Sequence, residues 1–213
     1  MGECWYRKSF TVPSEWQGKQ VILDFDGLMY NGDVYVNGVK LYSADYGYVG
    51  FEVDMSKYLN YGQDNLVEVY SSTGPSKGSR WYTGGGLFRN VYLELRNQVH
   101  ISRHGIYVTT PSVSAESSEV SVQVEVSGWQ GHDVSIKAEL FDPDGKTVGV
   151  TYGRMPEHTH QNVTEVKMES IQVRDARLWS PESPSLYKVE VSLYENGEPL
   201  DTSSDQSGIH SIE

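Results

Sequence analysis

Apolar and polar residues alternate with a period of two along much of the chain. In residues 120–126, 134–140 and 187–193, every second residue is apolar and its neighbours are mostly polar. Such alternation places the apolar side chains on one face of a half-buried β-strand. No window of helical length keeps a 3.6-residue period, and residues 55–59 allow one helical turn at most. The pattern therefore predicts an all-β fold.

Turn-forming residues separate the predicted strands at the spacing of a β-sandwich. Asn37-Gly38 lies between two short apolar segments, residues 34–36 and 39–41, and this dipeptide is a strong signal for a two-residue hairpin. Asp142-Pro143-Asp144-Gly145 and Asn196-Gly197 are two further turn sequences. Short strands joined by such turns favour sandwiches over larger mixed folds.

The two halves of the chain differ in character. Residues before Asn97 contain most of the tyrosines, three of the five tryptophans and many glycines, whereas the later residues form plainer Val/Ser/Glu strands. About seven of these later strands follow one another at the spacing of an immunoglobulin-like sandwich. We therefore expect two β-sandwich domains, residues 1–97 and residues 98–213.

Charge and cysteine content narrow the classes of function. The chain carries 29 acidic and 17 basic side chains, a net charge of −12, so it lacks the basic stripe that nucleic-acid binding needs. No apolar run of about 18 residues is present, so we predict no membrane partner. Cys4 is the only cysteine, which excludes an internal disulfide. The sequence leaves open whether the protein is in the bacterial periplasm or cytoplasm and whether it forms a homo-oligomer.

Asp24 and Asp26 are the first candidates for catalytic carboxylates. Two residues apart on a predicted strand, they share one face at about 6.5–7 Å, which is inside the separation of the acid and base of an inverting glycosidase. Val21, Leu23 and Phe25 alternate with them and form the buried set. This alternation predicts that both aspartates lie on the solvated face, so we interpret them as surface carboxylates.

His158 and His160 are the best candidates for metal ligands. Two histidines on one loop can bind a metal, but no third ligand stands at a suitable spacing and the chain has no cysteine cluster. The sequence also lacks the Gly-x-Ser-x-Gly elbow of serine hydrolases and a phosphate-binding loop. We therefore predict a solvated loop at these histidines, with no metal and no cofactor in this chain.

The segment from Ser79 to Leu95 is the most informative part of the chain. The run Arg80-Trp81-Tyr82 precedes three consecutive glycines, Gly84–Gly86, and an alternating strand, residues 91–95. Glycines let the backbone turn tightly or approach another surface closely. The aromatic rings and the guanidinium group offer flat faces and hydrogen-bond donors that suit sugar rings. Aromatic residues packed into the core of the sandwich explain the same composition equally well.

Six sequence fragments in a defined order carry a more specific signal. They are WYRKSFTVP (residues 5–13), LDFDG with VYVNG (23–27 and 34–38), GY to FEVD (47–54), GLFRNV (86–91), LWSPESPSLY (178–187) and GIHSIE (208–213). Together they resemble glycoside hydrolase family 2, and within it the β-galactosidase branch, over essentially the whole chain.

The resemblance implies a jelly-roll sugar-binding domain, then an immunoglobulin-like sandwich, then a (β/α)₈ barrel. In this family the barrel carries the general acid and the nucleophile of a retaining exo-β-glycosidase. The sequence contains neither the barrel nor the Asn-Glu pair that marks the family's acid/base, so we assign no catalytic residue to it. The chain is then expected to be the non-catalytic N-terminal portion of the enzyme, with its own catalytic barrel and a carbohydrate substrate as partners.

The same resemblance nominates Arg80, Trp81 and Tyr82 as substrate-binding residues. In several branches of the family, the loop before the Gly-rich turn contributes an Asp to the sugar pocket, and the matching position here is Arg80. Its guanidinium group can donate to sugar oxygens or to an acidic substrate group. The Arg80-Trp81-Tyr82 run favours a β-galactoside, and a β-glucuronide or a β-mannoside stays open.

Two hypotheses of other classes stand beside this one. A free-standing carbohydrate-binding module needs an aromatic platform on one sandwich, whereas a structural or adhesion module needs only the second domain. The candidate platform residues are Trp5, Trp16, Tyr46, Tyr48, Trp81 and Tyr82.

Overall fold

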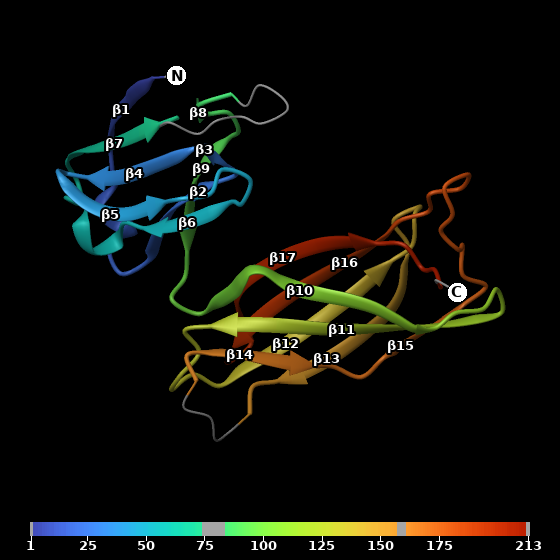
Figure 1. The fold of residues 1–213 in the computed structure, drawn as a ribbon. Helices are drawn as coiled ribbons and strands as arrows, with labels where there is room; N and C mark the ends of the chain where they lie inside the picture. Colours follow the sequence, from blue (N-terminus) through green and yellow to red (C-terminus); the bar gives the residue numbers. More distant parts are fainter. Residues whose placement is uncertain (1, 74–83, 157–160, 212–213) are drawn as a thin grey trace. The chain divides into compact units, whose positions relative to one another are not determined.

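Two β-sheet units make up the fold, Met1–Arg96 and Asn97–Glu213 (Figure 1). The computed structural model describes residues 2–73, 84–156 and 161–211. Within these ranges, every regular element is a strand apart from two 3-10 turns, η1 (Ser14–Trp16) and η2 (Ser56–Tyr58). The all-β prediction is therefore confirmed.

The first unit is a sandwich of two antiparallel sheets. One sheet has the order β1 (Glu3–Thr11), β7 (Asp64–Ser72), β4 (Asn31–Val36) and β5 (Val39–Ala44). The other has the order β6 (Phe51–Asp54), β2 (Gln20–Phe25) and β9 (Val91–Arg96), and a short ladder pairs β3 (Leu28–Met29) with β8 (Gly86–Leu87). Strands distant in sequence, such as β1 and β7, thus lie side by side (Figure 1), as in a jelly roll.

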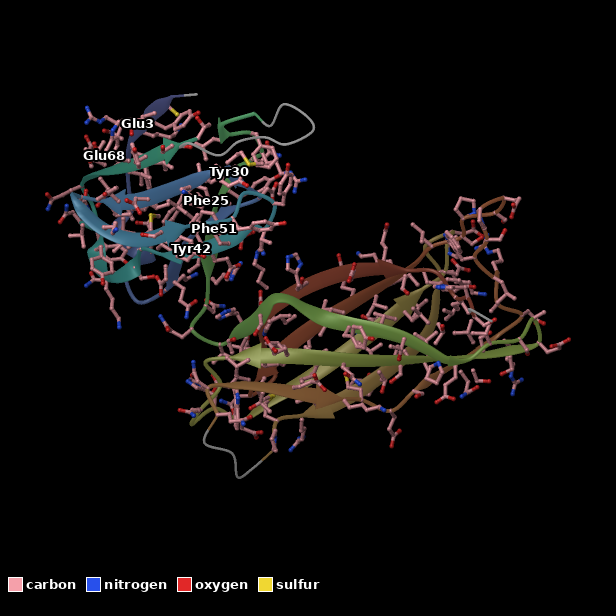
Figure 2. All side chains as sticks on the ribbon, in the orientation of Figure 1. Glu3, Phe25, Tyr30, Tyr42, Phe51 and Glu68 are labelled. Carbon is pink, nitrogen blue, oxygen red and sulfur yellow. The ribbon has the colours of Figure 1, made fainter. Side chains whose placement is uncertain are left out.

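A column of three aromatic rings links the two sheets of this unit. Phe25 of β2 stacks on Phe51 of β6 with 4.7 Å between ring centroids and 11° between ring planes. Tyr42 of β5 stacks on the other side of Phe51 at 4.4 Å and 9°. Figure 2 shows the three rings following one another, and the column fixes the spacing of the sheets at this side of the core.

The predicted hairpin turn at Asn37-Gly38 is present between β4 and β5. Both residues have positive φ, 50° at Asn37 and 80° at Gly38, which is the conformation of a type I′ turn. The Asn37 side chain also joins distant segments, since its Nδ2 donates to the carbonyl of Tyr58 at 2.8 Å and its Oδ1 accepts from Leu66 N at 2.9 Å. Asn196-Gly197 forms the same type of turn, with φ values of 51° and 83°.

The second unit is a second antiparallel sandwich. Its first sheet contains β10 (His100–Ser112), β11 (Ser117–Ser127), β14 (Val163–Lys167) and β15 (Ile171–Arg174), with β14 and β15 both paired to β11. Its second sheet has the order β13 (Thr147–Arg154), β12 (Val134–Phe141), β16 (Tyr187–Glu195) and β17 (Glu198–Ser207). The alternating apolar residues of β11, β12 and β16 are buried between the sheets, as their period predicts. This is the immunoglobulin-like architecture expected for the second half.

Candidate functional site

The residues nominated for substrate binding, Arg80, Trp81 and Tyr82, lie outside the described residues. The candidate metal ligands His158 and His160 also lie outside them. The geometry of the Gly-rich motif can be followed from Gly84 onward. The residues around this motif in the first unit show which groups are available there to contact a ligand.

The Gly-rich turn packs tightly against β1 and the end of β7. A Cβ atom on Gly85 would stand 2.2 Å from Cγ2 of Thr73, and one on Gly86 would stand 2.1 Å from Oη of Tyr6. Gly86 also has a φ of +85°, which favours glycine. Leu87 N donates a hydrogen bond to Tyr6 Oη at 3.3 Å. The close approach that the glycines permit is therefore an approach to their own sandwich.

Tyr6 is held by two neighbours at this position. Its hydroxyl group donates to the sulfur of Cys4, and this hydrogen bond raises the pKa of Tyr6 above its ordinary value of 10.0. The hydroxyl group is therefore neutral at physiological pH, so it donates to Cys4 while it accepts from Leu87 N.

Three segments come together at the end of the sandwich that the Gly-rich turn, Gly84–Gly86, reaches. A Cβ on Gly27 would meet the ring of Phe88 at 2.8 Å and the carbonyl oxygen of Gly47 at 3.3 Å. A Cβ on Gly47 would in turn meet Sδ of Met29 at 2.4 Å. We call this region, residues 26–30, 45–50 and 84–90, the loop end of the first unit. Glycines at these positions let the three backbones lie against one another.

The loop end exposes aromatic rings beside a guanidinium group. Tyr46 and Tyr48 are both exposed, with their ring centroids 5.8 Å apart and their planes inclined by 60°. Phe88 is also exposed, and the guanidinium carbon of Arg89 lies 5.1 Å from the centre of its ring. Aromatic faces pack on the apolar faces of sugar rings, and a guanidinium group donates to hydroxyl or carboxylate oxygens. This arrangement is suited to contacting a carbohydrate.

Sequence reasoning placed Phe88 and Arg89 in the fragment GLFRNV but did not nominate them as substrate-binding residues. The signal that can find such residues is an aromatic residue followed by a basic one, placed directly after a glycine-rich turn. Glycines allow a turn to reach the end of a sandwich, and residues that follow it are presented there.

The other aromatic residues proposed for a platform occupy different surroundings. Trp5 lies on β1 against Tyr70 and Tyr35, at centroid distances of 5.1 Å and 5.7 Å. Trp16 of η1 is half-buried and packs on the core of the first unit. Of the four described platform candidates, the ring contacts pair only Tyr46 with Tyr48.

Asp24 departs from the predicted solvated position. Its side chain is buried, with 8% of the residue exposed, although Val21, Leu23 and Phe25 form the buried inner face as expected. β2 is the central strand of its sheet, so Asp24 has a neighbouring strand on each side. Glu52 and Tyr92 lie directly opposite Asp24 in the register. Asp26 follows the end of β2 and is half-buried, so the two aspartates do not form an exposed pair.

The described ranges contain neither a metal-binding cluster nor a membrane-spanning helix. Among residues 2–73, 84–156 and 161–211, no three His, Cys, Asp or Glu side chains gather as a metal site requires. Within the same part of the chain, no helix is long and apolar enough to cross a membrane.

Comparison with known families identifies both units. The first matches the sugar binding domain of glycosyl hydrolases family 2 over residues 1–96, and the second matches the glycosyl hydrolases family 2 model over residues 99–210. Two sandwiches in this order are therefore a sugar-binding domain followed by the family's immunoglobulin-like domain. The chain belongs to glycoside hydrolase family 2.

Individual relatives agree with this assignment. The chain is 30% identical to a β-galactosidase of Bacteroides ovatus over 99% of its own length and 25% of that protein. It is also 30% identical to a putative β-glucuronidase of Formosa agariphila, over 99% of its length and 20% of that protein. A family 2 glycosyl hydrolase from Bacteroides cellulosilyticus has the same fold, with a TM-score of 0.91, 31% identity, and coverage of 98% of this chain and 28% of that one.

The coverage of these relatives shows how much of a related protein the chain represents. It spans about a quarter or less of the length of the curated relatives described above.

Proposed function

We propose that residues 1–213 are the non-catalytic N-terminal portion of a retaining exo-β-glycosidase that hydrolyses terminal β-galactosides. The observation that carries the proposal is the match of both family models, in order, on a chain that spans 25% of a related β-galactosidase. In this proposal a catalytic barrel, supplied by the rest of a longer polypeptide, holds the acid and the nucleophile. The two sandwiches support that barrel and complete its pocket.

The loop end of the first unit is the part that contacts the sugar in this proposal. Tyr46, Tyr48 and Phe88 provide exposed rings, and Arg89 provides donors beside them. Arg80, Trp81 and Tyr82 belong to the same Gly-rich segment and act with this group. A pocket built from several domains encloses more of a ligand than one sandwich surface does, so affinity arises in the complete enzyme.

A β-glucuronide is the second candidate substrate. The Gly-rich segment contains two arginines, Arg80 and Arg89, and a guanidinium group can form a bidentate pair with a carboxylate. A putative β-glucuronidase also matches the chain at the same 30% identity as the β-galactosidase. We propose a β-galactoside as the first candidate because the Arg80-Trp81-Tyr82 run resembles the β-galactosidase branch of the family.

The test is an assay of the full-length enzyme on chromogenic β-galactoside, β-glucuronide and β-mannoside. We expect the highest kcat/KM on the β-galactoside and no turnover by residues 1–213 alone. Preference for the β-glucuronide would replace the substrate assignment and keep the accessory role. Turnover by residues 1–213 that survives repurification and is lost in Asp24→Asn would contradict the accessory role itself.

Calorimetric titration of residues 1–213 with galactose and lactose separates this proposal from a free-standing binding module. We expect weak or undetectable binding, because most of the pocket walls are missing. A micromolar dissociation constant would instead support the binding-module hypothesis.

A further inference from the structure

Three apolar side chains of β9 are exposed although they face the interior of the first sandwich. Val91, Leu93 and Leu95 lie opposite Phe25, Leu23 and Val21 in the register, so they share the inner face of the sheet. They are nevertheless 37%, 43% and 38% exposed, whereas the three residues of β2 are buried. Within the described part of the chain, no element covers this half-open inner face.

The exposed face belongs to an apolar groove. The groove has a volume of about 430 Å³ and runs between β1, at one edge of the four-stranded sheet, and β9, at one edge of the three-stranded sheet. Its walls are mostly apolar and include Tyr6, Phe10, Leu87, Val91 and Leu93.

The backbone of β9 also presents an unpaired edge to this groove. Asp26 N donates to the carbonyl of Asn90 at 3.1 Å, and bonded positions alternate along an antiparallel pair. The register therefore directs the N–H and C=O groups of Tyr92 and Glu94 toward β2. Those of Val91, Leu93 and Leu95 point the opposite way, where no described strand pairs with β9. The same three residues thus offer both apolar side chains and backbone hydrogen-bonding groups.

Two cationic side chains, Arg7 and Lys8, line the opposite wall of the groove, and Arg7 is paired with Glu68. Lys8 lies on the inner face of β1, between Tyr6 and Phe10, and lines the groove. Within the described residues, no carboxylate pairs with Lys8. An occupant of the groove is therefore complementary when it carries a carboxylate at this position.

We infer that the groove holds a β-strand from the longer polypeptide, outside residues 1–213, which pairs with the free edge of β9. The inference rests on the proposal that the chain is part of a larger enzyme, and the two curated relatives described above are about four and five times as long as the stretch they share with it. The inserted strand alternates apolar and polar residues, covers Val91, Leu93 and Leu95, and carries an acidic residue facing Lys8. It completes the sandwich by strand addition.

A second copy of the chain fits the groove less well. Two concave grooves facing each other do not fill one another, and a symmetric contact brings the two copies of Lys8 toward each other. A single extended strand is convex, narrow and able to satisfy the free edge of β9.

Residue-resolved hydrogen exchange on residues 1–213 and on the full-length polypeptide tests the inference. We expect the amides of Leu93 and Leu95 to exchange at least about tenfold more slowly in the full-length protein, because the added strand accepts their hydrogen bonds. The amides of Tyr92 and Glu94, which point to β2, serve as internal controls and should change much less. Equal exchange at Leu93 and Leu95 in the two proteins would overturn the inference, as would protection in residues 1–213 that rises with protein concentration and so indicates a second copy.

Two substitutions at neighbouring positions sharpen the test. In the full-length protein, Leu93→Asp should abolish the protection of the Leu95 amide, since a charge then faces the inserted strand. Tyr92→Asn, on the opposite face of the same strand and similarly exposed, should leave that protection in place, and it sets no second carboxylate opposite Asp24. Retained protection in Leu93→Asp would also overturn the inference. Glycosidase activity is measured separately, so an inactive enzyme with a protected Leu95 refutes the proposed function alone.

Discussion

The backbone of Gly86 lies directly against the hydroxyl group of Tyr6. A Cβ atom on Gly86 would stand 2.1 Å from Tyr6 Oη and 3.2 Å from Cζ, and the next residue donates its N–H to the same hydroxyl group. The Gly-rich turn is thus held to β1 through one side chain. This contact holds β8, and with it residues 84–90 of the loop end, at a defined position on the sandwich.

Gly86→Ala should destabilise the first unit more than Gly18→Ala does. Both glycines have positive φ, +85° and +90°, but a Cβ on Gly18 meets nothing within 4 Å. Gly18→Ala should therefore cost only the backbone strain, about 1–2 kcal/mol, and Gly86→Ala should cost a further 1–3 kcal/mol or so from overpacking. Urea unfolding of the two variants measures the difference. Tyr6→Phe removes the clashing oxygen. The double variant Tyr6→Phe/Gly86→Ala should therefore lose less unfolding free energy than the two single variants lose together.

Arg96→Lys should destabilise the first unit more than Arg7→Lys does. Arg96 donates to both carboxylate oxygens of Glu52, Nη1 to Oε2 at 3.1 Å and Nη2 to Oε1 at 2.6 Å, and its Nε donates to Glu94 at 2.9 Å. Burial opposes the charged form of Arg96, but the two carboxylates outweigh it and raise its pKa above the ordinary value. Lysine keeps the charge and loses the planar fork, which should cost about 1–3 kcal/mol.

Arg7 supplies the matched control for this substitution. It pairs with Glu68 through a single contact, Nε to Oε1 at 2.7 Å, and its side chain is mostly exposed. Exposed pairs contribute about 0–1 kcal/mol, so Arg7→Lys should barely move the unfolding midpoint. Equal effects of the two substitutions would mean that the fork of Arg96 adds nothing beyond a surface ion pair.

Asp142 should make stability depend on pH in the acid range. Its carboxylate accepts hydrogen bonds from the backbone N–H groups of Lys146 and Asp144, both at 2.9 Å, and Arg177 lies nearby. The hydrogen bond from Lys146, followed by that from Asp144 and the charge of Arg177, lowers the pKa of Asp142 below 3.8. The stabilisation is therefore complete at neutral pH and is lost as the pH falls through the lowered pKa.

Comparison with Asp142→Asn tests this dependence. The stability difference between wild type and variant should be constant near pH 7 and should shrink once the pH falls below about 4. Thermal unfolding between pH 2 and pH 7 follows the difference, and NMR titration of the Asp142 carboxyl carbon measures its pKa directly. A difference that grows on acidification would contradict the sign of the shift.

Arg80→Ala in the full-length enzyme should lower kcat/KM if the guanidinium group donates to the substrate. Loss of a charge-assisted hydrogen bond of about 1.5–3 kcal/mol corresponds to about a ten- to 150-fold loss of kcat/KM. A residue that only packs on Trp81 or Tyr82 would instead contribute about 0.5–2 kcal/mol to folding. Kinetics and melting temperature are measured on the same variant. Unchanged kinetics with a lowered melting temperature would exclude substrate contact by Arg80.

Local patterns in the sequence were sufficient to predict the strands and several of the turns. Val120, Val122, Val124 and Val126 are all buried along one strand, because alternation assigns side chains to faces without reference to any other part of the chain. The Asn37-Gly38 hairpin is equally local, since only a few residue types tolerate two successive positive φ values. Six short fragments in order were enough to indicate the family.

Only the tertiary structure decided which faces are covered. The same alternation predicted an exposed Asp24 and placed Leu93 on the apolar face of its strand, yet Asp24 is 8% exposed and Leu93 is 43% exposed. Burial depends on the neighbours that a strand acquires: β2 is central and shielded by two strands, whereas β9 forms an edge beside an open groove. The contacts of Gly86 with Tyr6 and of Gly27 with Phe88 likewise join residues distant in sequence. A periodic pattern specifies the two sides of a strand, and the packing of the other strands determines which side meets water.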